Sequence, residues 1–259
     1  MINLSSRPID AKRVLKLLFA NVFLMMAQPV WSDVPLMIVT DPWPPYAISE
    51  NGVASGMDVE IVKAVFQSLG TSVEFQFCPW KRCLQQTKNL EADAILDVSL
   101  TPARQAILAF PDEPLSIGET VFFVLKGKAP AISGLSDLNS QKAGAMLGYN
   151  YCEEIDRMPF TQQAERANSL EQLFRMLLAE RVDFVIEGKA AGLASIQTLG
   201  VSELIEMMPN AAFCKEGNFL AFARKPGHEQ RVEQFDNALK AFKKTDAYRQ
   251  ILQRYGMAP

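Results

Sequence analysis

The stretch Ser99-Leu-Thr-Pro-Ala-Arg104 follows closely on an apolar run, Ala92-Asp-Ala-Ile-Leu96, and together they predict a buried strand that leads into a helix. Thr101 is typical of an N-cap, and Pro102 suits the first helical position because it has no N–H to leave unpaired. Arg104 then lies in the first turn, where backbone N–H groups, two hydroxyls and a guanidinium would favour a small anion such as a carboxylate. The motif alone leaves open the alternative of a capped helix with a surface arginine.

Residues 1–32 have the pattern of a secretory signal peptide. Basic residues accompany a short apolar stretch from Val14 to Ala27, which is shorter than the roughly 20 apolar residues that cross a bilayer. Val30 and Ser32 stand three residues and one residue before the expected cut, so the mature chain is predicted to begin at Asp33. We therefore expect a protein exported to the periplasm.

The charge of the chain argues against nucleic acid and anionic membranes as partners. The 259 residues carry a formal net charge of −3, and the predicted cleavage removes more basic than acidic residues. The length suffices for two small domains or for one larger domain.

The four cysteines of an exported chain predict two disulfides, for which three connectivities exist. We favour Cys78 with Cys83, which bracket a short segment at a predicted helix start, and Cys152 with Cys214, which we place in one lobe. Free thiols are the alternative. A metal site is disfavoured by the single histidine and by the lack of a Cys-x-x-Cys motif.

Strand-like and helix-like segments alternate, which predicts an α/β fold with mainly parallel sheets. A first set has strands at 36–40, 73–77 and 92–96 and helices at 59–69 and from Trp80 onward; the proline-rich loop 41–46 follows its first strand. A second set has strands at 142–147 and 182–186 and helices over 170–177 and 190–199. Asn168 and Glu171 resemble a capping box at the head of the 170–177 helix. The chain after Pro226 is predicted to be helical, with His228 at an exposed start.

Two further apolar strands, 120–125 and 219–223, stand where the chain would leave the first set and return to it. This predicts a first lobe of residues 33–124 and 220–259, a second lobe of residues 125–219, and a hinge of two strands. A ligand would then bind in the cleft between the lobes.

One short pattern occurs in both lobes. Glu91-Ala-Asp-Ala-Ile-Leu-Asp97 and Arg181-Val-Asp-Phe-Val-Ile-Glu187 each place a carboxylate at the carboxyl end of a strand, where α/β sheets bind ligands. The alternative is that Asp97 and Glu187 cap the following helices.

These motifs in their order resemble the bacterial extracellular solute-binding proteins of family 3, which serve ABC importers of polar amino acids. The resemblance extends from Leu36 to Tyr255. It is carried by these stretches: Thr40-Asp41-Pro42, Gly56-Met-Asp58-Val-Glu-Ile-Val, Trp80, Asp93-Ala-Ile-Leu and Ser99-Leu-Thr-Pro-Ala-Arg104-Gln. It implies a two-lobed type II periplasmic binding protein, acting as a monomer with an ABC permease as partner, and without a cofactor.

The resemblance also implies ligand contacts. Arg104 would hold an α-carboxylate, with a hydroxyl donor at Ser99, and an aromatic residue of the first loop, Trp43 or Tyr46, would pack on the ligand. The loop after the first strand of the second lobe would add contacts at Gly148, Tyr149 and Asn150. With the residues discussed above, the expected ligand-binding set is Asp41, Trp43, Tyr46, Asp97, Ser99, Thr101, Arg104, Tyr149, Asn150 and Glu187. Trp80 and Arg82 are further candidates for the cleft, although core packing is the more expected role of Trp80.

The sequence departs from the family pattern at positions that bear on the ligand. Leu96 and Asp97 replace small hydroxyl residues, and Gly188 stands where the family has an aspartate for the ammonium group, with Glu187 one residue earlier. One cationic site, Arg104, and two anionic sites, Asp97 and Glu187, suit a zwitterion or a ligand with an additional positive group.

We expect a binding protein without catalytic residues. The resemblance leaves two alternatives: a periplasmic dehydratase that acts on prephenate-like acids, with Asp97 and Glu187 as acid and base, and a sensory module that signals through a membrane partner.

Overall fold

The computed structural model of the protein describes residues 34–209 and 214–257. The predicted signal peptide and its cleavage site lie outside these ranges. Of the helices described, none has the length and apolar character to cross a membrane.

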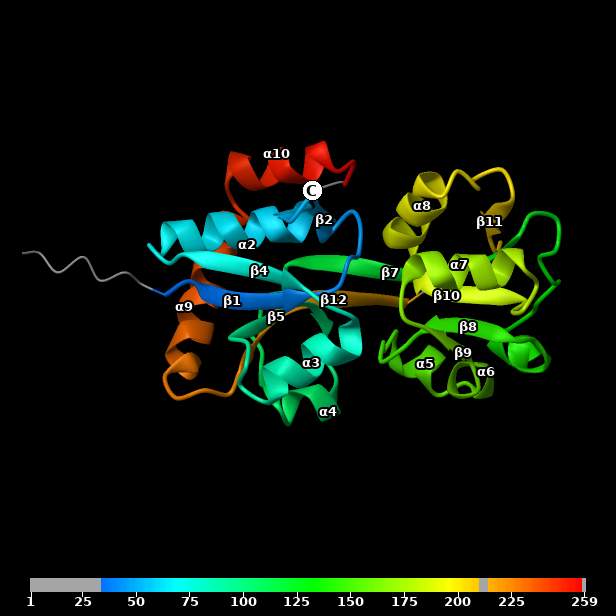
Figure 1. Ribbon diagram of the computed structural model, residues 1–259, viewed down its shortest axis with the longest axis horizontal. Helices are drawn as coiled ribbons and strands as arrows, with labels where there is room; N and C mark the ends of the chain where they lie inside the picture. Colours follow the sequence, from blue (N-terminus) through cyan, green and yellow to red (C-terminus); the bar gives the residue numbers. More distant parts are fainter. Residues whose placement is uncertain (1–33, 210–213, 258–259) are drawn as a thin grey trace, which may run out of the picture. The chain divides into compact units, whose positions relative to one another are not determined.

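The first group of elements forms one half of a mixed sheet. Its strands β1 (Leu36–Thr40), β4 (Val73–Phe77) and β5 (Ala94–Ser99) are parallel, with β1 in the middle. Helices α2 (Met57–Ser68) and α10 (Asp246–Arg254) lie on one side of them, and α3 (Trp80–Lys88) and α4 (Pro102–Gln105) on the other (Figure 1). The group also contains the hairpin β2 (Ile48–Glu50) and β3 (Val53–Ser55), the short strand β6 (Leu108–Ala109) and helix α9 (His228–Phe242).

The second group repeats this plan. Strands β10 (Phe184–Gly188), β8 (Ala143–Met146) and β9 (Glu165–Ala167) are parallel in that order. Helices α7 (Leu170–Leu178) and α8 (Lys189–Thr198) lie on one side, and α5 (Glu153–Asp156) and α6 (Pro159–Gln162) on the other (Figure 1). A 3-10 helix, η1 (Leu135–Ser140), and the short strand β11 (Ile205–Met207) complete the group.

Two antiparallel ten-residue strands, β7 (Ser116–Leu125) and β12 (Cys214–Ala223), join the two groups into one sheet of order β4-β1-β5-β12-β7-β10-β8-β9. β12 pairs with β7 from Cys214 to Asn218 and with β5 from Asn218 to Phe222. β7 in turn pairs with β10 from Thr120 to Phe123. The fold is therefore two-lobed, and both long strands change partners where the lobes meet.

The partner change on β7 lies several residues before residue 124, where the sequence places the first lobe boundary. On β12 the change is at Asn218, next to the predicted boundary after residue 219. The boundaries themselves stay a prediction.

Aromatic side chains fill the core of each lobe. Phe66 packs against Phe235 at 5.1 Å between ring centroids in the first lobe, and Phe122 packs against Phe184 at 5.3 Å in the second. Gly56 precedes α2, where a Cβ would lie 2.4 Å from the carbonyl oxygen of Tyr46. Only glycine therefore allows this close approach of α2 to the proline-rich loop.

The short pattern that occurs in both lobes contains an aspartate, Asp93 or Asp183, that makes the same kind of backbone contact in each lobe. Asp93 accepts a hydrogen bond from the N–H of Met37 at 2.9 Å, and Asp183 accepts one from the N–H of Lys142 at 2.7 Å. Each carboxylate thus ties its own strand to the amino end of the neighbouring strand.

Two local predictions are wrong. The cap of α7 is Ser169, which accepts the N–H of Gln172, so the predicted box at Asn168 and Glu171 is out of register by one residue. His228 is buried, not exposed, because its ring packs on Phe222 and its Nδ1 bonds the carbonyl of Ala223 at 2.7 Å.

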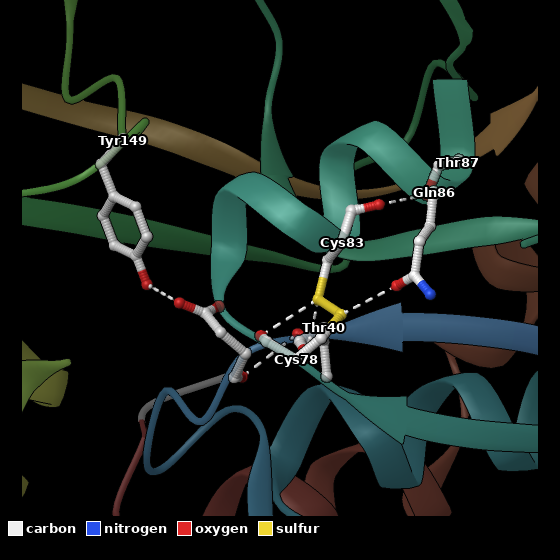
Figure 2. The surroundings of a disulfide bond; sticks show 7 residues. Thr40, Cys78, Cys83, Gln86, Thr87 and Tyr149 are labelled. Carbon is white, nitrogen blue, oxygen red and sulfur yellow. Dashed lines mark hydrogen bonds between the residues drawn. A yellow bond between two sulfur atoms is a disulfide. The ribbon is translucent and has the colours of Figure 1, made fainter. Parts of the chain in front are cut away.

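The structure contains both favoured disulfides, Cys78–Cys83 and Cys152–Cys214. Figure 2 shows the first of them, at the start of α3 next to Thr40 at the end of β1. The second joins the segment before α5 to the first residue of β12, so it ties the second lobe to a strand that continues into the first.

We predict that the two disulfides differ in their contribution to stability. They close loops of 62 and 5 residues, and loop-closure entropy gives about 4 kcal/mol for the long loop and about 2 kcal/mol for the short one. Urea unfolding of the Cys152→Ser/Cys214→Ser and Cys78→Ser/Cys83→Ser variants measures both. An equal loss, or a larger loss from the short loop, would contradict the entropic argument.

Candidate functional site

A cavity of about 60 Å³ lies where β7 and β12 change partners, with walls from both lobes. The polar and aromatic residues of its wall are Asp41, Trp43, Trp80, Asp97, Ser99, Arg104, Glu119, Thr120, Tyr149, Asn150, Tyr151, Glu187, Glu216 and Asn218. Several follow the carboxyl ends of the parallel strands β1, β5, β8 and β10. This is the edge at which an α/β sheet binds ligands.

Arg104 is buried and bonds both lobes. Its guanidinium donates to the carbonyl and the hydroxyl of Ser99 in its own lobe, and to the carbonyl of Gly148 in the other lobe at 3.1 Å. It also lies over the ring of Trp80, at 5.4 Å from the ring centroid. Burial lowers the pKa of Arg104 to about 10, so the group stays charged at neutral pH.

The predicted helix start at Thr101 is confirmed, because its side chain accepts the N–H of Arg104. The helix α4 has only four residues, however. Its dipole is therefore small, and the anion-binding capacity of this region comes from the Arg104 side chain.

Asp41 and Tyr149 connect the lobes directly. The Tyr149 hydroxyl donates to Asp41 Oδ2 at 2.7 Å, and Figure 2 shows Tyr149 approaching from the second lobe beside the Cys78–Cys83 disulfide. Burial raises the pKa of Asp41 to about 7, although the hydrogen bond from Tyr149 opposes the shift. The carboxyl group therefore changes charge near neutral pH.

Glu187 and Trp43 form the second such contact. Trp43 Nε1 donates to Glu187 Oε1 at 3.0 Å, and the N–H of Gly188 donates to the same oxygen at 2.8 Å. Glu187 Oε2 is buried and receives no hydrogen bond from the described residues. Burial raises the pKa of Glu187 to about 7. Its free oxygen is the part that a ligand can use.

Asp97 lies inside β5 with a φ of +59°, a conformation that aspartate adopts more readily than most residues. In the described chain, no amide, hydroxyl or cationic group donates to either of its carboxyl oxygens. Burial and the neighbouring charge of Asp58 raise the pKa of Asp97 well above its usual value. Burial also raises the pKa of Asp58, to about 6. The cavity wall thus presents a carboxyl group that forms no ion pair with a described residue, and a cationic group of a ligand could bind it.

The structure brings eight of the ten predicted ligand contacts to the cavity wall: Asp41, Trp43, Asp97, Ser99, Arg104, Tyr149, Asn150 and Glu187. The other two are placed elsewhere. Tyr46 is buried behind Trp43, on which it stacks at 4.4 Å between ring centroids, and the Thr101 hydroxyl is used as a helix cap.

Of the two additional candidates, Trp80 and Arg82, only Trp80 lies at the cavity wall. Trp80 is buried and lines the cavity, and its Nε1 donates to the carbonyl of Gly148 at 3.0 Å. Its role therefore combines packing with a contact between the lobes. Arg82 is exposed on α3 and does not reach the cavity wall.

Sequence reasoning missed the cavity residues of the two long strands, chiefly Glu119, Thr120, Glu216 and Asn218. Glu119, Glu216 and Asn218 precede the predicted strands 120–125 and 219–223, and they were missed because the observed strands begin earlier, at Ser116 and Cys214. Burial raises the pKa of Glu216 to about 7, with the charge of Asp156 adding to the effect.

The charges of the cavity are unbalanced. Among its described wall residues, Arg104 is the single basic one, and it shares the wall with five acids: Asp41, Asp97, Glu119, Glu187 and Glu216. Glu119 pairs with Lys189 at 3.1 Å, whereas the other four acids form no ion pair with a described residue. Buried carboxylates without cationic partners take up protons or bind cations. The cavity therefore favours a ligand with one carboxylate and more than one positive charge.

We predict that Gly188→Ala disturbs the Trp43–Glu187 contact. A Cβ at position 188 would lie 3.0 Å from Cζ2 of Trp43, so the indole has to shift, at a cost of about 1–2 kcal/mol. A lower melting temperature and a changed tryptophan emission spectrum are expected. Gly134→Ala is the control, because a Cβ there meets no atom within 4 Å. Equal behaviour of the two variants would show that Trp43 is not held in place by this contact.

Comparison with known proteins identifies the relatives of this chain. The family model for bacterial extracellular solute-binding proteins, family 3, matches residues 36–258. An L-arginine-binding protein of Pseudomonas aeruginosa is 23% identical over 93% of this chain and 95% of its own length.

Two solved structures share the fold. A histidine kinase sensor domain with similarity to periplasmic binding proteins superposes with a TM-score of 0.77 at 19% identity, over 87% of this chain and 98% of its own. The arginine-, lysine-, histidine-binding protein ArtJ of Geobacillus stearothermophilus gives 0.75 at 19% identity, over 87% and 97%. With its two-lobed periplasmic-binding-protein fold, the chain belongs to the bacterial extracellular solute-binding proteins, family 3.

Proposed function

We propose that the protein is a periplasmic solute-binding protein that captures a positively charged amino acid and delivers it to an ABC-type permease. The observation that carries this proposal is the unbalanced charge of the cavity, with one arginine among five acids. The name of the Pseudomonas aeruginosa relative supports the same ligand class.

Arg104 is the proposed site for the ligand carboxylate. A guanidinium can donate two parallel hydrogen bonds to a carboxylate, and such charged bonds are stronger than a bond to a carbonyl. One of its donors bonds the carbonyl of Gly148. The ligand would replace this bond with a charged pair and supply a negative charge to neutralise the guanidinium.

Glu187, Asp97 and Asp41 are the proposed sites for the positive groups of the ligand. Glu187 Oε2 and both Asp97 oxygens lack a donor among the described residues. They belong to different lobes, so a ligand that bonds both of them stabilises the closed arrangement. Trp43 holds Glu187 in place through its Nε1.

The size of the cavity requires movement on binding. At about 60 Å³ it is smaller than the 150 Å³ cavity that holds a benzene molecule. The bonds that link the lobes across it include Tyr149–Asp41, Trp43–Glu187, Trp80–Gly148, Arg104–Gly148 and Ser99–Asn150. We infer that the ligand enters when the lobes separate and that its own hydrogen bonds then replace part of this set.

An acid–base enzyme is the second candidate function. Asp41 and Glu187 have pKa values of about 7 and lie in the same cavity, which is the condition for a general acid and a general base. Incubation with prephenate separates the two functions, because a dehydratase would form an aromatic chromophore and a binding protein would not.

We predict that Arg104→Ala removes ligand binding. Loss of a buried charged partner costs about 2–5 kcal/mol, so affinity should fall at least about 30-fold. A thermal-shift screen of the mature protein against amino acids, polyamines, betaines and organic acids first identifies the ligand. Arg82→Ala is the control, since it removes the same charge from an exposed position. If Arg104→Ala retains the full ligand-induced shift, the carboxylate does not bind there.

We predict that affinity for a cationic amino acid rises with pH between about 5 and 8. The pKa values of Asp41 and Glu187 lie near 7 instead of near 4, so both carboxyls ionise in this range, while ammonium groups with pKa values near 10 stay charged. One group contributes at most about tenfold per pH unit. Calorimetry at several pH values tests this, and an affinity that is flat or falls would contradict it.

The raised pKa values of Asp41 and Glu187 should also make the stability of the free protein depend on pH, in the opposite direction to the ligand affinity. Because the folded state binds these protons more tightly than the unfolded state, the stability of the free protein should fall as the pH rises from about 4 to 7. Melting temperatures measured without ligand over the same pH series test this, and they should fall as the pH rises.

A further inference from the structure

A second opening, with a volume of about 500 Å³, lies next to the ligand cavity and also has walls from both lobes. Three prolines, Pro42, Pro44 and Pro79, line it in the first lobe, and Met146, Leu170 and Leu199 line it in the second. We call this opening the apolar groove. It is several times larger than the ligand cavity, and most of its surface is apolar.

Asp41 belongs to both walls. Its side chain is buried, and its Oδ2 accepts the hydroxyl of Tyr149, which lines the ligand cavity but not the groove. Asp41 is therefore the residue that the two walls share, and Tyr149 contacts it from the side of the ligand cavity. A ligand group that displaces Tyr149 from Asp41 would lie at the boundary and could extend into the groove.

The residues of the groove wall indicate which kind of ligand group fits into it. Its charged residues in the described chain, Asp41 and Glu171, are both acidic, so an anionic extension is disfavoured. The Ser169 hydroxyl at the head of α7 is already used, because it accepts the N–H of Gln172. Prolines offer no N–H groups and hold a fixed φ. The wall thus presents a stiff apolar surface with few free hydrogen-bond donors.

We propose that the ligand is a basic amino acid whose terminal nitrogen carries an apolar substituent and keeps its charge. The carboxylate would bind Arg104, the charged nitrogen would lie at Asp41, and the substituent would fill the apolar groove. This inference rests on the proposed function and narrows its ligand class. An apolar molecule alone would lack the polar contacts that orient it.

Calorimetry with L-lysine and Nε-benzyl-L-lysine tests the proposal, because the two ligands carry the same charges and differ by one aromatic ring. Burial of the ring in the groove should tighten binding about tenfold or more. The measured quantity is the ratio of the two affinities, which is independent of how well the lysine head itself binds.

A filling variant shows whether the ring lies in the groove. Thr198 is exposed at the end of α8 and lines the groove, whereas the adjacent Gln197 is exposed and does not. Thr198→Trp should reduce the affinity ratio to about 1, by occupying the space of the ring, and Gln197→Trp should leave the ratio unchanged.

The outcomes separate this inference from the proposed function. A ratio near 1 or below in the parent protein, or a ratio that Thr198→Trp does not reduce, overturns the groove as a subsite and leaves the proposed function intact. Failure of every basic amino acid and benzyl derivative to bind overturns both.

Discussion

The whole site depends on two strands that change partners partway along their length. The two strands pair with each other over their amino-terminal halves. The carboxyl-terminal half of β12 then pairs with β5 of the first lobe, and that of β7 pairs with β10 and β11 of the second. Side chains from both lobes meet where these pairings change. The carboxyl ends of the parallel strands point to the same place, which brings Asp41, Ser99, Tyr149 and Glu187 around a single cavity.

The acids buried around this cavity leave its charge unbalanced, and two features of the protein reduce the cost of burying them. Protonation is the first, since burial moves the pKa values of Asp41 and Glu187 to about 7. Donation of hydrogen bonds from the opposite lobe is the second, through Tyr149 and Trp43. Both devices are reversible, so a cation that supplies the missing charge can take the place of either.

The sequence predicted the fold well because strand and helix periodicities, cap residues and proline-rich loops are local signals. It also predicted Arg104, Asp97 and Glu187 near the carboxyl ends of β5 and β10, and all three line the cavity. It failed where the outcome depends on packing between distant segments. The stacking of Tyr46 behind Trp43, the burial of His228 and the inward position of Glu216 are set by neighbours far away in the chain. The Thr101 hydroxyl serves as a helix cap. The sequence alone does not distinguish this role from that of a ligand contact.

The equivalent aspartates at the amino ends of the parallel strands in the two lobes affect how force passes through the molecule. Asp93 and Asp183 each tie two neighbouring strands together at the end opposite to the cavity. These bonds tie the strands together at the end away from the cavity, in addition to the pairing of the strands themselves. If a ligand moves the lobes, as proposed, the ties favour movement of each lobe as one body with bending in the long strands between them, so that a small molecule repositions surfaces much larger than itself.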